Sequence, residues 1–214
     1  FLESHFQEGA SALILDEVQK VPDLFDAVKA SVDLERRPGR FILSGSTEFS
    51  RKTGVRESLT GRIGLRRLYP LTLAECLGNK ASVPWVRTTH GSAEVLNTDV
   101  SRWIERGGMP GICFLRESGE RAAAIETWLE TTCFRDIQQI RGARLSGELA
   151  KEVLEVLARL ERPTAAEVAS KLKTDARRIR NHLEALEALF VLQRLDPHPS
   201  GTGKPHYQIF DAGV

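Results

Sequence analysis

Two adjacent carboxylates, Asp16 and Glu17, follow a short apolar run in the stretch SALILDEVQK at residues 11–20. Phosphoryl transfer from a nucleoside triphosphate requires a divalent cation that neutralises the phosphates and a group that orients the attacking water. Neighbouring side chains at the end of a strand point in different directions, so Asp16 can reach the metal while Glu17 faces the water. The pair predicts half of a nucleotide-hydrolysing site, although a strand that simply ends in solvated charge has the same pattern.

A second polar group, SGST, follows the apolar run at residues 41–43. A hydroxyl at the end of a strand next to that of Asp16 can touch the same water or the γ-phosphate of the nucleotide. We expect Ser46 in this role, with Ser44 and Thr47 as alternatives. SGST is a weak signal alone, and it gains weight only together with the paired carboxylates.

The sequence also predicts the elements that bring these polar groups together. Residues 12–15 and 41–43 are short apolar runs typical of strands buried on both faces. Between them, Pro22 opens a segment whose apolar residues recur at helical spacing until RRPGR ends it. Strand, helix and strand within about 30 residues form a βαβ unit, whose two strands are parallel neighbours. Ligands of such sheets bind beyond the carboxyl ends of the strands, and both polar groups fall there.

A change in composition and hydrophobic periodicity divides the chain into two regions. Residues 78–98 show no sustained hydrophobic period and are rich in Gly, Asn, Ser, Pro and Thr. We therefore expect a first region at residues 1–77, a linker at 78–98 and a helical region at 99–214. The predicted fold class is α/β followed by mainly α, with a partial parallel sheet in the first region.

The end of the second region predicts a winged helix-turn-helix at about residues 146–214. Three helical segments are followed there by two strand-like runs around a turn rich in Pro and Gly. The T-x-x-E pattern that starts at Thr164 predicts a capping box for the second of these helices. The same pattern starts at Thr72, where it predicts the beginning of another helix.

The third helix of this region carries a basic cluster that can contact DNA. Its N-terminal half presents Arg177, Arg178, Arg180 and His182. Arginine at this place in a helix-turn-helix binds phosphates or guanine edges in a major groove. Acidic residues share the helix, and alternating charges also indicate a solvated face with local ion pairs. Protein contact or a purely structural role therefore stays open beside DNA binding.

The motifs together resemble a known family. LILDE at residues 13–17, LSGST at residues 43–47, LTGR ending at Arg62 and YPLTLAE are similar to the second half of the nucleotide-binding domain in bacterial and archaeal AAA-like ATPases that carry a DUF4143-type C-terminal region. In this resemblance LILDE is the Walker B motif, LSGST is the sensor-1 strand and Arg62 is a candidate arginine finger. GGMPG, CFRDI and KPHYQIFDAGV are similar to C-terminal motifs of the same family, so the resemblance covers nearly the entire chain.

The resemblance implies a P-loop ATPase that acts as a molecular switch, with ATP and Mg²⁺ as its cofactors. Asp16 would hold Mg²⁺, Glu17 would act as the base, Ser46 as the sensor, and Arg62 would lie near the γ-phosphate. The alternative is a non-enzymatic winged-helix module that binds DNA or dimerises on an α/β platform. A degenerate ATPase that keeps only a protein-interaction role is a third interpretation.

One motif of the family does not occur in the sequence. A P-loop, G-x-x-x-x-G-K-[ST], supplies backbone amides and a lysine to the phosphates, and no such string occurs in these 214 residues. Members of the family carry it upstream of the Walker B strand, and the chain begins at Phe1, with Met109 as its only methionine. We therefore expect a fragment of a longer ATPase. This chain alone is expected to bind ATP and Mg²⁺ poorly and to be inactive.

The composition narrows the choice of partners and location. A net charge of +1 gives no global reason to expect nucleic acid or a membrane surface as a partner. Three cysteines without a CxxC pair and five scattered histidines favour neither a disulfide framework nor a further metal site. No apolar run approaches the ~20 residues of a membrane span. We expect a cytoplasmic protein without membrane contact, whose partners are an unidentified protein, DNA or further copies of the chain.

Overall fold

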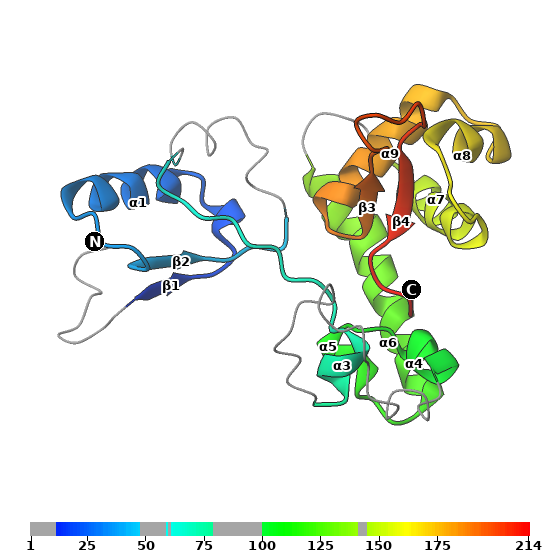
Figure 1. Cartoon of the computed structure of the whole chain (residues 1–214), viewed down its shortest axis with the longest axis horizontal. Helices are drawn as coiled ribbons and strands as arrows, with labels where there is room; N and C mark the ends of the chain where they lie inside the picture. Colours follow the sequence, from blue (N-terminus) through cyan, green and yellow to red (C-terminus); the bar gives the residue numbers. More distant parts are fainter. Residues whose placement is uncertain (1–11, 48–58, 60, 79–99, 141–144) are drawn as a thin grey trace. The chain divides into compact units, whose positions relative to one another are not determined.

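Figure 1 shows the chain as a computed structural model, which describes residues 12–47, 59, 61–78, 100–140 and 145–214. The chain divides into two compact units, residues 1–67 and residues 68–214. We call them the N-terminal unit and the C-terminal unit.

The N-terminal unit is built on one βαβ motif (Figure 1). Strand β1 (Leu13–Leu15) pairs in parallel with strand β2 (Phe41–Leu43). The 3-10 turn η2 (Val18–Lys20) and helix α1 (Asp23–Leu34) connect the two strands. The prediction of two parallel neighbouring strands joined by a helix is confirmed.

The core of this unit lies on one face of the two-stranded sheet. Its buried side chains in the described part of the unit are Val18, Phe25, Val28 and Leu59. On the opposite face, Ile14 and Ile42 stand opposite each other in the sheet register and are 68% and 50% exposed. The prediction of strands buried on both faces is therefore wrong for the described residues, because none of their elements covers this second face.

The C-terminal unit begins with helices, most of them short. In chain order they are α3 (Leu73–Cys76), α4 (Val100–Arg106), α5 (Pro110–Cys113) and α6 (Ser118–Glu130). Helix α6 continues into a π-helical turn, η6 (Thr131–Asp136), and a 3-10 turn, η7 (Ile137–Gln139). Cys133 in η6 and Ile137 in η7 are fully buried, so this irregular end of the helix forms part of the core.

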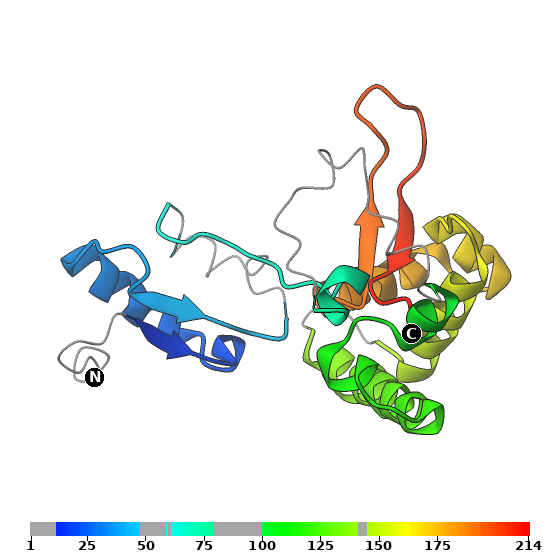
Figure 2. The same cartoon turned by 60° about the horizontal axis from the view of Figure 1, so that its bottom comes forward.

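Three further helices and a hairpin complete the C-terminal unit. They are α7 (Gly147–Arg159), α8 (Ala165–Lys171), α9 (Ala176–Ala188), β3 (Leu192–Leu195) and β4 (His206–Ile209). The two strands are antiparallel, and Figure 2 shows the loop between them extending beyond the helices. A polar side chain caps the start of each of the three helices by accepting backbone N–H bonds: Ser146, Thr164 and Asp175.

The main core lies where these three helices meet the hairpin. Its members with no exposed surface include Val153, Val168, Ile179, Leu183, Leu186 and Leu192. The predicted order of three helices and two strands is confirmed, and so is the mixed α/β class of the chain. The winged helix-turn-helix and the P-loop fold stay predictions.

Two further predictions concern the boundary and the membrane. The linker predicted at residues 78–98 lies outside the described residues except for Gly78. None of the described helices combines the length and the apolar character that crossing a membrane requires.

Candidate functional site

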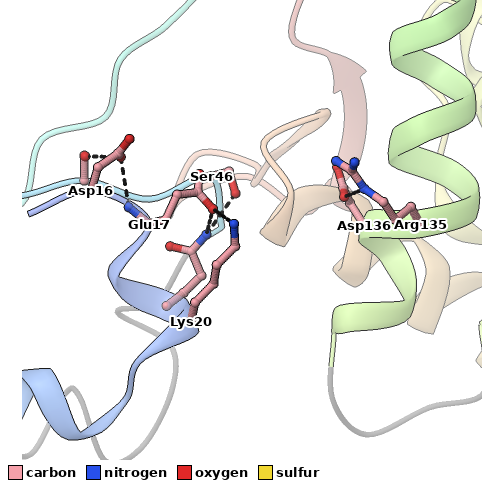
Figure 3. A network of polar contacts seen from close by, with 8 residues as sticks. Asp16, Glu17, Lys20, Ser46, Arg135 and Asp136 are labelled. Atoms are coloured by element: carbon pink, nitrogen blue, oxygen red, sulfur yellow. Dashed lines mark hydrogen bonds and ion pairs between the residues drawn. The ribbon is translucent and has the colours of Figure 1, made fainter.

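Asp16 lies just beyond the carboxyl end of β1 (Figure 3). Its Oδ1 accepts a hydrogen bond of 2.5 Å from the Ser44 hydroxyl and one of 2.9 Å from the backbone N–H of Glu17. These bonds, above all the one from Ser44, hold the pKa of the Asp16 carboxyl below its ordinary value. Asp16 is therefore a carboxylate at neutral pH, which is the form that binds a metal ion.

The backbone turns sharply at Glu17, where the chain leaves the direction of the strand. Its φ of 54° and ψ of 37° are left-handed values that non-glycine residues rarely adopt. Oε2 of Glu17 accepts a hydrogen bond from Nε2 of Gln19 and pairs with Nζ of Lys20, each at 3.0 Å (Figure 3). The Glu17 side chain is 40% exposed, so water reaches it although two donors hold it.

One amide group links Glu17 to Ser46. Nε2 of Gln19 donates to Glu17 Oε2 and also to Ser46 Oγ, both at 3.0 Å. Oε1 of the same amide is buried and has no hydrogen-bond partner among the described residues. A buried amide oxygen without a partner is costly, so this position is suited to accept a donor from a bound molecule or from further protein.

Backbone hydrogen bonds hold the two strand ends together beneath these side chains. The N–H of Ser44 donates to the carbonyl of Leu15 at 2.9 Å, and the N–H of Val18 donates to the carbonyl of Ser44 at 3.1 Å. The ladder between β1 and β2 thus continues past the strands into the polar segments. It brings together three of the predicted site residues, Asp16, Glu17 and Ser46, and adds Ser44 and Gln19. We call these five residues the Asp16 cluster.

Sequence reasoning missed Gln19 for a physical reason. The predicted strand ends before Glu17, so no strand alternation indicates that Gln19 lies on the same side as Glu17. Only the left-handed backbone at Glu17 turns the following 3-10 turn back toward the carboxylate. Ser44, in contrast, was an alternative in the SGST motif, because the end of a neighbouring parallel strand is a predictable location.

Arg62 is not part of the Asp16 cluster. Its guanidinium forms a bidentate ion pair with Asp33, 2.7 Å from Nε to Oδ1 and 3.1 Å from Nη2 to Oδ2. This pairing holds the pKa of the Asp33 carboxyl below its ordinary value. Asp33 lies in the last turn of α1, whereas Asp16 and Glu17 precede the helix. The rise of 1.5 Å per helical residue puts about 15 Å of helix between the two ends.

The residues of the Asp16 cluster fit a magnesium ion in part. The described part of the chain holds no group of three or more His, Cys, Asp or Glu side chains placed for a metal ion. The cluster does offer the carboxylate of Asp16 and the hydroxyls of Ser44 and Ser46, which are hard oxygen donors. Mg²⁺ commonly binds through one or two carboxylates, several waters and the phosphates of a substrate. The donor set therefore suits Mg²⁺ that takes its remaining ligands from a nucleotide and water.

The structure separates the candidate DNA-contact residues into two groups. Three of them are exposed on α9: Arg177, Arg178 and Arg180. His182, predicted on the same surface, is instead fully buried. Its Nε2 accepts a hydrogen bond of 3.0 Å from the backbone N–H of Ser146, and its Nδ1 lies 2.8 Å from the Arg178 carbonyl. His182 therefore ties α9 to the start of α7, and the prediction that it contacts DNA is wrong.

The GGMPG turn joins two segments far from it in the sequence. The Gly108 carbonyl accepts a hydrogen bond of 2.7 Å from the Leu71 N–H, and the Gly108 N–H donates to Oδ2 of the buried Asp211 at 2.8 Å. A Cβ on Gly108 would collide with the Leu71 carbonyl. Gly107 has a φ of +67°, and a Cβ there would collide with the Asp211 carboxylate. The motifs YPLTLAE, GGMPG and KPHYQIFDAGV thus meet at one point, which we call the glycine clasp.

Two regions of the chain match known family models. Residues 1–77, which contain the Asp16 cluster, match the model described as AAA domain. Residues 97–209, more than half of the chain, match the model described as domain of unknown function DUF8612. The chain belongs to the DUF8612 family. An AAA-type region precedes its DUF8612 part.

The DUF8612 match extends over α4 to β4 and includes the GGMPG turn and the basic face of α9. The resemblance predicts a DUF4143-type region here. This finer assignment is not shown, since the model that matches is that of DUF8612. The AAA-type character of the first region is shown by its own match.

Similar curated proteins are longer than this DUF8612 chain. It is 28% identical over 214 residues to an uncharacterized protein of Mycobacterium bovis and, to the same extent, to one of Mycobacterium tuberculosis. The alignments cover 96% of this chain but 44% of each relative, so the chain spans less than half of their length. No solved structure matches the chain significantly.

Proposed function

We propose that the chain is the Walker B half of an AAA-type ATPase joined to a DUF8612 region, and that the longer protein is an ATP-hydrolysing molecular switch. The observation that carries this proposal is the meeting of Asp16, Glu17 and Ser46 at the carboxyl ends of two parallel neighbouring strands. The match of residues 1–77 to the AAA domain supports it independently of the geometry.

Four residues of the Asp16 cluster have a role in this proposal: Asp16, Glu17, Gln19 and Ser46. Asp16 binds Mg²⁺ as a carboxylate, since its hydrogen bonds keep it ionised. The bound ion would neutralise charge on the phosphates. Glu17 accepts the proton of the attacking water. Gln19 and Lys20 both hold Oε2 of Glu17, and among the contacts of the described residues this leaves Oε1 for that water. Ser46 senses the γ-phosphate or the same water.

Nucleotide binding requires a P-loop that is not in this sequence. The exposed Ile14 and Ile42 support further protein over this face of the sheet, because parallel sheets are normally covered on both faces. The relatives are more than twice as long as the aligned segment, which leaves room for the missing strand and P-loop. We therefore place the phosphate-binding half in the upstream sequence of the longer protein, and ATP as the cofactor of that protein rather than of this chain alone.

Arg62 is proposed as the arginine finger, acting on the site of a neighbouring subunit. Its ion pair with Asp33 lies at the far end of α1, about 15 Å of helix away from Asp16. An arginine that lies far from Asp16 and Glu17 of its own chain is suited to reach a nucleotide bound by a neighbouring subunit. This role makes a homo-oligomer part of the proposal.

The test of the ATPase proposal uses the longer protein. An upstream sequence without G-x-x-x-x-G-K-[ST] would end the proposal. Where the P-loop is present, Glu17→Gln should lower ATP turnover roughly 100-fold or more and leave ATP bound, because the base is lost but the phosphate contacts remain. The matched control is Asp23→Asn, which removes one exposed carboxylate at the start of α1 and should leave turnover unchanged. Unchanged turnover in Glu17→Gln removes this residue from the mechanism.

A second candidate function is DNA binding by a winged helix-turn-helix in the DUF8612 region. Three observations favour it: α8 and α9 follow each other closely, α9 exposes Arg177, Arg178 and Arg180, and a hairpin follows as a wing. Helices of this type bind with their N-terminal residues in the major groove, and exposed arginines there suit phosphates and guanine.

The DNA candidate is tested by reversing charges on α9. Arg177→Glu together with Arg180→Glu should weaken binding to duplex DNA at least about tenfold and reduce its salt slope by about 2. The control pair, Arg159→Glu and Arg162→Glu, changes the same charge at two exposed positions, the last residue of α7 and the loop after it, and should leave binding unchanged. If the unmutated chain binds no DNA at low salt, the exposed face of α9 serves a protein partner or dimerisation instead.

A further inference from the structure

A cavity of about 360 Å³ in the C-terminal unit is lined by residues from the start of α3, from α4, from the glycine clasp and from the hairpin. We call it the hairpin cavity. Its volume lies within the range of small-molecule sites, which runs from about 300 to about 1,000 Å³. None of the residues that line it belongs to the Asp16 cluster or to the basic face of α9. The hairpin cavity is therefore separate from both candidate sites described above.

Three aromatic side chains line the hairpin cavity: Tyr69, Trp103 and Phe210. They come from three separate segments, because Tyr69 precedes α3, Trp103 lies in α4 and Phe210 follows β4. The rings of Tyr69 and Phe210 pack together, with their centroids 5.4 Å apart. Aromatic rings bind other flat rings by stacking, so this part of the lining favours a flat ligand.

Two glutamine amides line the same cavity from the hairpin. Gln193 in β3 and Gln208 in β4 stand directly opposite each other in the register, so their side chains leave the same face of the hairpin. Within the described part of the chain, neither amide has a hydrogen-bond partner, so both are available to a ligand. A glutamine amide carries a donor and an acceptor side by side, and this pair matches the N6–H and N7 groups of adenine.

The charges around the hairpin cavity favour an uncharged ligand. Among the described residues that line it, Asp211 is the only charged one, and the N–H groups of Gly108 and Gly213 each donate to one of its two oxygens at 2.8 Å. The guanidinium of Arg106 lies over the Trp103 ring, 5.3 Å from its centroid. This cation already interacts with the ring and would repel a second cation. A phosphate or carboxylate, in turn, meets no basic side chain in the described lining.

We propose that the hairpin cavity binds an adenine base. The flat ring stacks on the aromatic side chains, and a glutamine amide binds its N6 and N7 edge. Guanine presents two acceptors on this edge, which suit arginine or lysine, and the described lining contains neither. The base belongs either to a free nucleoside or to a single-stranded nucleic acid, because both present the same ring and edge. The site is independent of the proposed ATPase site, whose nucleotide requires a P-loop that this sequence lacks.

The experiment titrates adenosine into the ¹⁵N-labelled 214-residue chain and follows the side-chain amide signals of Gln193 and Gln208 by NMR. Gln→Leu variants assign the two signals. We expect at least one of them to shift in a saturable way, with a Kd on the order of 1 mM or lower. Single-stranded oligo(dA) is the second ligand. Saturation with adenosine identifies a free nucleoside as the source of the base, and saturation with oligo(dA) alone identifies a base within a strand. No shift of either signal with either ligand would overturn the proposal.

A first pair of variants tests stacking. Tyr69→Ala removes a ring that is 56% exposed, so the variant should fold, and it should weaken binding of the saturating ligand about tenfold. The matched control is Phe114→Ala, which removes a ring of similar exposure, 54%, that does not line the cavity. Binding to this control should be unchanged. Equal affinity of Tyr69→Ala and the unmutated chain contradicts the proposed site.

A second pair of variants tests recognition of the base edge. Replacing Gln193 and Gln208 together by leucine removes both amides and should weaken binding about tenfold, whereas Gln139→Leu, at an exposed position of η7, should leave it unchanged. 7-Deazaadenosine, or oligo(dA) built from it, keeps the ring but lacks N7. It should bind about tenfold more weakly than the parent ligand to the unmutated chain and equally weakly to the double variant. Equal affinity of the unmutated chain for both ligands overturns the assignment of adenine.

Discussion

The two units of the chain differ in the size of their cores, and the unit with the candidate catalytic site has the smaller core. The N-terminal unit holds the Asp16 cluster on a two-stranded sheet, with its small core on one face and Ile14 and Ile42 exposed on the other. The C-terminal unit has an extensive core shared by three helices and a hairpin. A two-stranded sheet is marginal without further packing. The N-terminal unit, which holds the candidate site, therefore depends more than the C-terminal unit on protein outside the described residues for its stability.

The largest expected effect comes from the core of the C-terminal unit. Leu183→Ala removes a fully buried side chain of α9 and should lower the free energy of unfolding by about 3 kcal/mol, because it leaves a cavity among rigid neighbours. Val28→Ala, in the N-terminal core, should leave this main transition unchanged. Chemical denaturation followed by circular dichroism measures both variants.

The exposed Leu34, 85% accessible at the end of α1, supplies the control, and Leu34→Ala should shift nothing. If Val28→Ala lowers the main transition as much as Leu183→Ala does, the two units unfold as one. The contrast between a dependent and an independent unit would then be lost.

Features that depend on neighbours in sequence were predictable. The T-x-x-E patterns at Thr72 and Thr164 both form capping boxes, because the two partners of a capping box are only three residues apart. The parallel pairing of β1 and β2 followed from the strand, helix and strand order. That pairing was enough to bring Asp16 and Ser46 to the same edge, and so the candidate site was largely predictable.

Features that depend on distant partners were not predictable. The ion pair between Arg62 and Asp33 joins residues that no local period connects. His182 lies three residues after Ile179 and four before Leu186, on the apolar stripe of α9, so helical spacing indicates its burial but not the backbone donor that it meets at the start of α7. The link between Gly108 and Asp211 spans nearly half the chain. Such contacts are set by tertiary packing, which charge and hydropathy patterns do not encode.

The boundary between the two units can be tested at the glycine clasp. Gly108→Ala should cost about 2 kcal/mol of stability, because its Cβ would collide with the Leu71 carbonyl and the backbone would have to shift. Gly111→Ala, three residues later in the same motif, has open space around its Cβ and should be neutral or slightly stabilising. Thermal unfolding of the two variants gives the comparison.

An equal loss of stability in both glycine variants would mean that a side chain at either position of the motif is destabilising, whether or not it collides with Leu71. A selective loss in Gly108→Ala ties Leu71, which lies within the AAA domain match, to the fold of the C-terminal unit. The end of the family match and the end of the folded unit would then be different positions in the chain.

The smallest expected effect is the change in Tm when the glutamate of each capping box is replaced by glutamine. Hydrogen bonds from the Thr164 backbone N–H and hydroxyl hold the pKa of Glu167 below its ordinary value of 4.5. A lowered folded-state pKa gives stability that is complete above the ordinary value and is lost as the pH falls through the folded one. Glu167→Gln should therefore lower Tm by at most about 2 °C at pH 7, and by progressively less as the pH falls below the ordinary pKa.

Glu75→Gln makes the same change in the capping box of α3, where the Thr72 bonds also lower the pKa of the carboxyl. Helix α3 buries none of its residues, whereas α8 buries Val168 and Ala169 in the main core. The same cap should thus affect Tm less in α3 than in α8, because fraying of α3 exposes no core residue. A larger loss in Glu75→Gln would show that α3, through Leu71 and the glycine clasp, supports the C-terminal unit more strongly than its own burial indicates.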